Sequence, residues 1–250
     1  TEEDVRRARR LCALDAPKPW EIIAITFTNK AAGELKDRLA ARLGPEANDI
    51  WASTFHSACV RILRRDIEKL GFDRSFTIYD SADSERVVKD VLKDQRIDDK
   101  AFPARSVLSA ISRAKDSMLS GPEYLAQCEK AGDFRLTKIA KVYVEYQRRL
   151  WEASALDFDD IIIFTVRIFQ QFPDVLEKYR NRFRYIMVDE YQDTNRAQYA
   201  ITQLLAAKNR NIMVVGDDDQ SIYSWRGADL RNILEFESDY PEAKVVKLEQ

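Results

Sequence analysis

Short apolar runs rich in β-branched residues are the feature that most restricts the fold of this chain. They lie at Ile22–Phe27, Ile50–Ser53, Phe76–Tyr79, Tyr185–Val188 and Ile212–Val215, with a last candidate at Lys244–Leu248. Runs of this length are typical of strands buried on both faces, and helical patterns separate several of them. The sequence therefore predicts an α/β fold with a parallel sheet covered by helices.

Helix boundaries can be placed from turn residues. Lys30–Leu43 is predicted as a helix that Gly44-Pro45 ends, and Ser57–Leu70 as a helix that Gly71 ends. A later helix, Asn195–Ala207, is expected between two of the strands.

The middle of the chain has a different pattern. Residues 81–155 carry only helical patterns, and Leu136–Trp151 has apolar side chains at helical spacing. We therefore expect a core made of residues 1–80 and 156–250, with residues 81–155 inserted as an all-helical subdomain.

The composition of the chain is typical of a folded globular protein. Charged residues make up 33% and hydrophobic residues 45% of the chain, as in a folded globular protein, and the net charge of −2 allows nucleic-acid contact only through a local patch. Cys12, Cys59 and Cys128 are far apart without a C-x-x-C pair, so we expect packed thiols in a reducing cytoplasm rather than disulfides or zinc. The acidic start is unlike a signal peptide, and no apolar run reaches the roughly 18 residues of a membrane span.

Two carboxylates follow the run Tyr185–Val188. Asp189 and Glu190 would stand at the carboxyl end of a buried strand, where open parallel sheets bind ligands. One carboxylate can hold Mg²⁺ while the other orients and deprotonates an attacking water. The alternative is a solvated acidic turn, which the continuation into Gln192 and Asp193 disfavours.

A second polar segment follows Ile212–Val215. Gln220 offers an amide that could bridge a phosphate and another group, and Tyr223 and Trp225 offer surfaces for base stacking, with Arg226 as a cation beside them. The alternative is that both aromatic residues belong to the core.

Together these segments closely resemble the UvrD/Rep family of superfamily 1 DNA helicases, especially its PcrA-like members. The matching strings are Ile25–Leu35, Trp51–Ser57, Leu156–Asp160, Val188–Tyr199 and Val215–Asp229. Leu248-Glu249-Gln250 looks like the start of the next family motif. Because several motifs occur in order over about residues 20–250, the resemblance is specific.

The resemblance implies a RecA-like P-loop NTPase core with an inserted helical subdomain. It implies ATP and Mg²⁺ as cofactors, with Asp189 as the Mg²⁺ ligand of bound Mg-ATP, Glu190 as the catalytic base, and Gln220 as the γ-phosphate sensor that couples to DNA. The residues that would stack on bases are Phe27, Tyr223 and Trp225. Those that would touch the strand or its backbone are Thr28, Asn29, Thr54, His56 and Arg226.

The implied activity is ATP-dependent 3′-to-5′ movement along single-stranded DNA. The implied partners are single-stranded DNA, junctions of single- and double-stranded DNA, and DNA-repair or replication proteins.

Some charged residues have two interpretations. His56, the only histidine, is either structural or a DNA contact. We expect Lys115 to be solvated rather than bound to duplex phosphates. The pairs Arg64-Arg65 and Arg148-Arg149 are expected on solvated helix faces.

The family's glycine-rich phosphate loop is missing, because no glycine precedes Gly33. The family's γ-phosphate arginine and second RecA-like core are missing as well. The chain is then either a piece of a longer helicase, which the intact carboxylates favour, or a truncated paralogue that only binds single-stranded DNA. Either way, we expect the chain alone neither to hydrolyse ATP efficiently nor to unwind DNA.

A metal-dependent nuclease is a third, less favoured possibility. It would use Asp189, Glu190 and the acidic residues 217–219, and Mg²⁺-dependent DNA cutting without ATP would support it.

Overall fold

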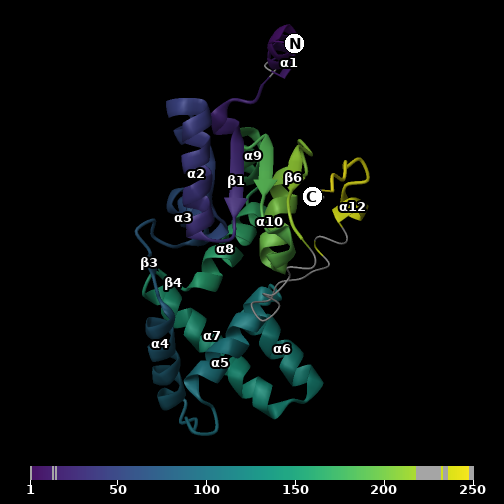
Figure 1. The fold of residues 1–250 in the computed structure, drawn as a ribbon. Coiled ribbons are helices and arrows are strands. Elements are labelled where there is room, and N and C mark those ends of the chain that lie inside the picture. The colour runs from purple at the N-terminus through teal and green to yellow at the C-terminus, as the bar shows by residue number, and fades with distance from the viewer. Residues whose placement is uncertain (1, 13, 15, 218–231, 233–235, 248–250) are drawn as a thin grey trace.

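The central element of the fold is a parallel sheet. The computed structural model describes residues 2–12, 14, 16–217, 232 and 236–247. The strands lie in the order β2 (Trp51–Thr54), β1 (Ile22–Thr26), β5 (Tyr185–Val188) and β6 (Ile212–Val214), and every neighbouring pair is parallel (Figure 1). The α/β class with a parallel sheet is thereby confirmed.

The two faces of the sheet are covered differently. Ile23 and Ile25 of β1 point into the main core, shared with α3 (Phe55–Asp66) and α8 (Phe158–Gln171). Ala24, between them, points to the opposite face, under α2 (Asn29–Leu43). Farther along that second face, Met187 and Met213 are 36% and 51% exposed. In the described structure α2 therefore covers only the half of this face formed by β1 and β2.

The remaining elements around the sheet are short. On the main-core face lie α9 (Pro173–Arg182) and α10 (Arg196–Ala206). The 3-10 turns are η1 (Pro19–Glu21), η2 (Gly44–Asp49), η3 (Ile67–Leu70) and η4 (Tyr191–Asp193). Helix α1 (Glu2–Cys12) stands apart from the body (Figure 1). The phenylalanine of α12 (Phe236–Asp239) packs against the Tyr191 ring.

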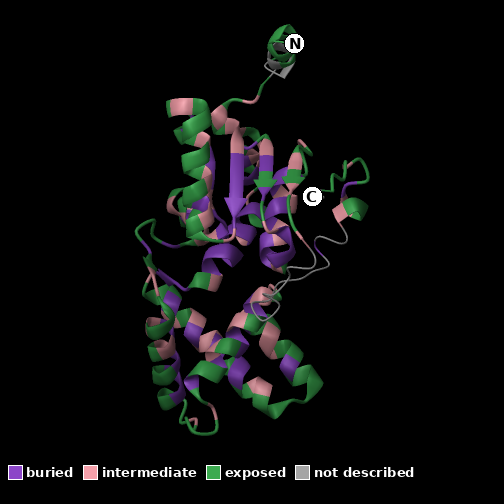
Figure 2. Cartoon of the chain, viewed as in Figure 1, coloured by how far each residue is buried: buried purple, intermediate pink, exposed green. Residues whose placement is uncertain are grey.

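Residues 81–152 form a helical body below the sheet. It consists of α4 (Ser81–Asp94), α5 (Ala104–Asp116), α6 (Gly121–Ala131) and α7 (Phe134–Glu152). These helices enclose a hydrophobic cluster of their own, which includes Val88, Ile111 and Tyr146, and Figure 2 shows buried and exposed residues alternating along these helices. The apolar periodicity of α7 thus buries one face of that helix against its neighbours.

A two-stranded ribbon connects the helical body to the core. The chain leaves through β3 (Thr77–Ile78) and returns through β4 (Ala155–Leu156), which lies parallel beside it. The amide of Tyr79 donates to the carbonyl of Leu156 at 2.8 Å. The outgoing and returning segments are therefore held together by backbone hydrogen bonds.

Two strand predictions need correction. Phe76–Tyr79 contains a strand, but only at Thr77–Ile78, and it pairs with β4 outside the main sheet. Lys244–Leu248 was wrong as far as its described residues go, because 244–247 have no strand conformation. Val245 and Val246 are 61% and 76% exposed, so these β-branched residues have no sheet on which to pack.

Helix ends follow the predicted turn chemistry. Gly44 and Gly71 adopt φ of +70° and +86°, in the region that L side chains rarely adopt, and they end α2 and η3. Asp80 caps α4 by accepting hydrogen bonds from the amides of Ala82 and Asp83.

We expect Ile62→Ala to test the importance of the core between the sheet and α3. Ile62 is 1% exposed, so its truncation should lower the free energy of unfolding by about 2–5 kcal/mol. The matched control is Leu43→Ala, at a side chain that is 51% exposed, with an expected change of about 0.5 kcal/mol or less. Urea unfolding measures both variants, and equal losses would contradict this packing.

Candidate functional site at the carboxyl edge of the sheet

The carboxylate pair lies where the sequence predicted it, at the carboxyl end of β5. The amide of Asp189 still donates to the carbonyl of Ile25 at 2.9 Å, and the amide of Tyr191 donates to that of Val215 at 3.0 Å. Between them Glu190 has a left-handed backbone, with φ of +52°. This conformation is uncommon outside glycine and marks a tight turn that the neighbouring strands hold in place.

Gln192 connects this turn with the end of β6. Its side-chain amide donates to Glu190 Oε2 at 2.8 Å, and its Oε1 accepts from the backbone amide of Asp217 at 3.1 Å. Gln192 is 1% exposed, whereas Glu190 and Asp217 are half-buried, so both bonds are partly buried. The sequence indicated Gln192 only as an extension of the acidic pair, and this bridging role was not predicted.

Burial and like charge act together on these carboxylates. Partial desolvation and the neighbouring Glu190 raise the pKa of Asp189, and the same two causes raise the pKa of Asp193. A cation placed here would relieve that repulsion. Among the described residues no group of three acids, histidines or cysteines could hold a metal. A pair of carboxylates nevertheless fits Mg²⁺ that arrives with phosphates, since Mg²⁺ commonly takes one or two carboxylates plus phosphate oxygens.

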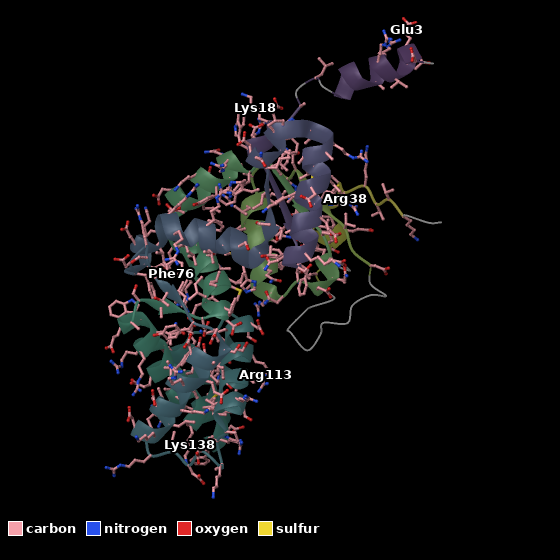
Figure 3. All side chains as sticks on the ribbon, turned by 60° about the vertical axis from the view of Figure 1, so that its left-hand side comes forward. Glu3, Lys18, Arg38, Phe76, Arg113 and Lys138 are labelled. Atoms are coloured by element: carbon pink, nitrogen blue, oxygen red, sulfur yellow. The ribbon has the colours of Figure 1, made fainter. Side chains whose placement is uncertain are left out.

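Asp189 borders a pocket on the α2 face of the sheet. The pocket has a volume of about 280 Å³, and its wall includes Glu34 and Arg38 of α2 as well as Met187 and Met213 (Arg38 is labelled in Figure 3). It thus combines an apolar floor with charged groups at its rim, as binding sites for small molecules commonly do.

A second, larger hollow lies between the core and the helical body. It measures about 720 Å³ and is lined by both Phe27 and His56, which were predicted as DNA contacts. Arg113 and Asp116 of α5 line its other side, and Arg113 is labelled in Figure 3. The structure therefore brings Phe27 and His56 together, although they follow different strands.

His56 is held by the residue that begins α8. Its ring meets the Phe158 ring edge to face, with centroids 5.9 Å apart. Burial lowers the pKa of His56, and a hydrogen bond with the Phe158 backbone opposes this only in part. The imidazole is therefore favoured in its neutral form, which can donate or accept a hydrogen bond.

The predicted threonine contacts are occupied as helix caps. Thr28 accepts from the amide of Ala31 at 3.1 Å, and Thr54 accepts from the amide of Ser57 at 3.3 Å. Thr28 and Asn29 are exposed beside Phe27, whereas Thr54 is only 8% exposed. Gln220, Tyr223, Trp225 and Arg226 lie outside the described residues.

Lys115 corrects a prediction. It is 1% exposed instead of solvated, and its Nζ donates to Asp157 Oδ2 at 2.6 Å and to Asp160 Oδ1 at 2.7 Å. Tyr146 donates its hydroxyl to the same oxygen of Asp157 at 2.8 Å, and Gln147 donates to Asp160. Lysine, with its flexible stem, is buried in this way only when its charge is paired.

This network joins the two bodies. Lys115 belongs to α5, whereas Asp157 and Asp160 form the capping box of α8 in the core. Burial alone would lower the pKa of Lys115, but the two carboxylates raise it well above its ordinary value. Burial and the nearby Asp157 raise the pKa of Asp160 to about 6.

Asp116 makes a second link, to the loop that follows the carboxylates. Its Oδ1 accepts from the side-chain amide of Asn195 at 3.1 Å, and Asn195 caps α10. Burial and the charge of Asp159 raise the pKa of Asp116 to about 6.

The arginines predicted on solvated helix faces differ in their exposure. Arg148 is exposed and paired with Glu145 and Glu152, and Arg149 pairs with Glu145 and Asp94. Arg64 is half-buried and donates to the Arg74 carbonyl. Cys59 and Cys128 are buried free thiols, and no described helix is long and apolar enough to cross a membrane.

The fold and site together define an α/β protein with a parallel sheet whose carboxyl edge carries an acidic pair beside two hollows. The model of the UvrD/REP helicase N-terminal domain matches residues 5–241, so the chain belongs to this helicase family.

Relatives agree with this assignment. The chain is 53% identical over 232 residues to ATP-dependent DNA helicase PcrA of Bacillus subtilis (strain 168), covering 93% of this chain. It is 56% identical to the protein of that name from Staphylococcus epidermidis and 54% identical to the one from Staphylococcus aureus, with the same coverage. In each case it spans about 31% of the relative's length.

We expect Lys115→Met to destabilise the protein strongly. The change leaves Asp157 and Asp160 buried without their cation, which should cost about 3–5 kcal/mol of unfolding free energy. Lys138→Met, at an exposed lysine of α7, is the control and should change little. Urea unfolding measures both, and adding Asp160→Asn to Lys115→Met should restore part of the loss. Equal stability of the two single variants would contradict a paired buried lysine.

We expect Asp116→Asn to stabilise the protein in a pH-dependent way. The pKa of Asp116 rises from 3.8 to about 6 on folding, so the folded state retains the proton longer. Stability due to this group therefore falls as pH rises from 3.8 to 6, and the full cost is present above pH 6. The variant should gain about 1–2 kcal/mol near pH 7.5, and almost nothing below pH 4. Chemical unfolding at each pH tests this, with Asp37→Asn, at an exposed carboxylate, as the control variant.

Proposed function

We propose that this chain is the first motor segment of an ATP-dependent DNA helicase that moves 3′ to 5′ along single-stranded DNA. In this proposal the core is formed by residues 1–80 and 156–250, and residues 81–155 are an inserted helical subdomain. The parent protein would act in the cytoplasm on single-stranded DNA and its junctions with duplex, together with DNA-repair or replication proteins.

The Glu190–Gln192–Asp217 bridge is the observation that carries this proposal. Glu190 is oriented by Gln192, and Gln192 in turn binds the backbone at the end of the next strand. Through these two hydrogen bonds, a change at the acidic pair would reach the backbone of Asp217, which precedes Gln220 in the sequence. A nucleotide-driven motor requires such a connection between its hydrolytic group and its strand-binding segment.

On the nucleotide side, each residue has a distinct proposed role. Asp189, exposed at the pocket, would hold Mg²⁺ bound to ATP, and that ion would neutralise charge on the phosphates. Glu190 would orient the attacking water and accept its proton. Gln220 would respond to the γ-phosphate. The phosphate loop and the second core would be supplied by the parent protein, so the chain alone should not hydrolyse ATP efficiently.

On the DNA side, the hollow between core and helical body would receive the strand. Phe27 would stack on a base, joined by Tyr223 and Trp225, while Thr28, Asn29, Thr54, His56 and Arg226 would contact the strand or its backbone. The neutral ring favoured for His56 suits a hydrogen bond to a base or sugar rather than an ion pair with phosphate. Base stacking on each aromatic ring would contribute about 1–3 kcal/mol, independently of sequence.

A single-strand-binding protein without motor activity is the competing function. Such a protein would use Phe27, Tyr223 and Trp225 as a stacking platform for bases without any nucleotide. This function predicts DNA binding that does not change with nucleotide.

We expect Glu190→Gln in the full-length parent to separate these functions. ATP hydrolysis stimulated by single-stranded DNA should fall by about 100-fold or more, because a general base is lost. The affinity for single-stranded DNA should stay within about twofold, since the amide keeps the shape of the side chain. Exposed Glu46→Gln is the control and should leave both quantities unchanged. A parent without measurable ATP hydrolysis would favour the binding protein instead.

A further inference from the structure

Three arginines surround one tryptophan on the outer side of the core. The guanidinium carbons of Arg61, Arg182 and Arg65 lie 4.0, 5.1 and 5.5 Å from the centroid of the Trp51 ring. We call Arg61, Arg65 and Arg182 the arginine cluster. It lies beside β2, the edge strand of the sheet, and away from the acidic pair on β5.

The cluster is assembled from separate elements. Arg61 and Arg65 are four residues apart on α3 and so share one face of that helix, whereas Arg182 is the last residue of α9. Trp51 is 3% exposed and meets the Phe183 ring edge to face at 4.8 Å, which fixes the surface on which the guanidinium groups rest.

The cluster has no acidic counterpart. Within the described part of the chain, none of its three arginines forms an ion pair with a carboxylate. Neighbouring Arg64 also forms no ion pair with a carboxylate among the described residues, but it has a backbone acceptor, the Arg74 carbonyl at 2.6 Å, and lies over Phe76, which Figure 3 labels. Burial, Arg65 and Arg182 lower the pKa of Arg61, and Tyr179 opposes this only in part. Three like charges therefore repel one another at a site that an anion would stabilise.

Two buried donors lie in the same place. Trp51 Nε1 and Arg182 Nε are both buried and have no hydrogen-bond acceptor within the described structure. Unsatisfied buried donors are costly and uncommon in folded proteins. An oxyanion that enters the cluster would offer acceptors as well as charge.

We propose that the arginine cluster binds the phosphodiester backbone of DNA beyond the strand contacted at the carboxyl edge of the sheet. The inference rests on the proposed function for its choice of ligand. Guanidinium groups suit this role, because their planar donors match phosphate oxygens in pairs.

The position on α3 favours a nucleic acid over an acidic protein. His56 lines the proposed strand-binding hollow at the start of the same helix. With a rise of about 1.5 Å per residue, Arg61 and Arg65 lie roughly 8 and 14 Å farther along. Protein interfaces also need an apolar centre, but Trp51 is buried, and no large hydrophobic side chain of α3 or α9 is exposed.

The test compares oligonucleotide lengths on the 250-residue chain. Fluorescence anisotropy measures binding of single-stranded DNA of about 6 and about 20 nucleotides, the first near the lower end of common single-strand sites of roughly 4–16 nucleotides and the second beyond their upper end. Arg61→Gln, Arg65→Gln and Arg182→Gln are combined in one variant. It should bind the short strand like the wild type and the long strand at least about tenfold more weakly. The magnitude of its slope of log affinity against log salt concentration should fall by about 2, because each of the three lost phosphate contacts contributes about 0.7 on a single strand.

Matched variants separate charge from folding. The variant in which lysine replaces all three arginines should retain most of the salt slope, because lysine keeps the positive charge. Arg42→Gln, at an exposed arginine of α2, should leave the affinity for both the short and the long strand unchanged. Thermal unfolding of the triple glutamine variant is followed in parallel, and if that variant is unstable, the lysine variant and single Arg61→Gln replace it.

The outcomes are distinct. Unchanged binding of the long strand in the triple glutamine variant would overturn the inference while leaving the proposed function intact. Failure of the wild type to bind either strand would instead count against the proposed function. Polyglutamate that binds the cluster more tightly than the long strand would identify an acidic-protein surface and so also overturn the inference.

Discussion

The ion network of Lys115 with Asp157 and Asp160 fixes how the helical body sits on the sheet. Apolar contacts between helices are non-directional and tolerate small shifts, whereas a buried ammonium must keep its carboxylates within hydrogen-bond distance. A displacement of α5 by a few ångströms would leave these charges buried and unpaired. Because Asp157 and Asp160 also form the capping box of α8, the same carboxylates determine where that helix begins.

The Lys115 network also determines the shape of the hollow between the core and the helical body. One wall carries Phe27 and His56, and the other carries Arg113 and Asp116 of the helix that Lys115 anchors. Through Asp116 and Asn195 the anchored helix also contacts the start of α10, just after the turn that holds the acidic pair. The acidic turn is therefore tied to the sheet by its backbone and to the helical body by a side chain.

Much of the architecture could be predicted because its signals are local. Tyr185–Val188 has the predicted bounds, and α2 ends where Gly44 permits a left-handed backbone. The partners of Lys115 are 42 and 45 positions away, so nothing near it in the sequence distinguishes it from a solvated lysine. Strand β4, at two residues, is too short for any periodicity. The bridging role of Gln192 likewise depends on a backbone amide of a different strand end.

The β3–β4 ribbon places both ends of the helical body at one point of the core. Thr77 and Ala155 are paired neighbours, so the point where the chain departs and the point where it returns adjoin each other. A short loop could then close the core if the intervening helices were excised, or a foreign domain could be grafted at the same joint. Such a graft must also neutralise Asp157 and Asp160 or bring its own cation, since the lysine that serves them would leave with the excised segment.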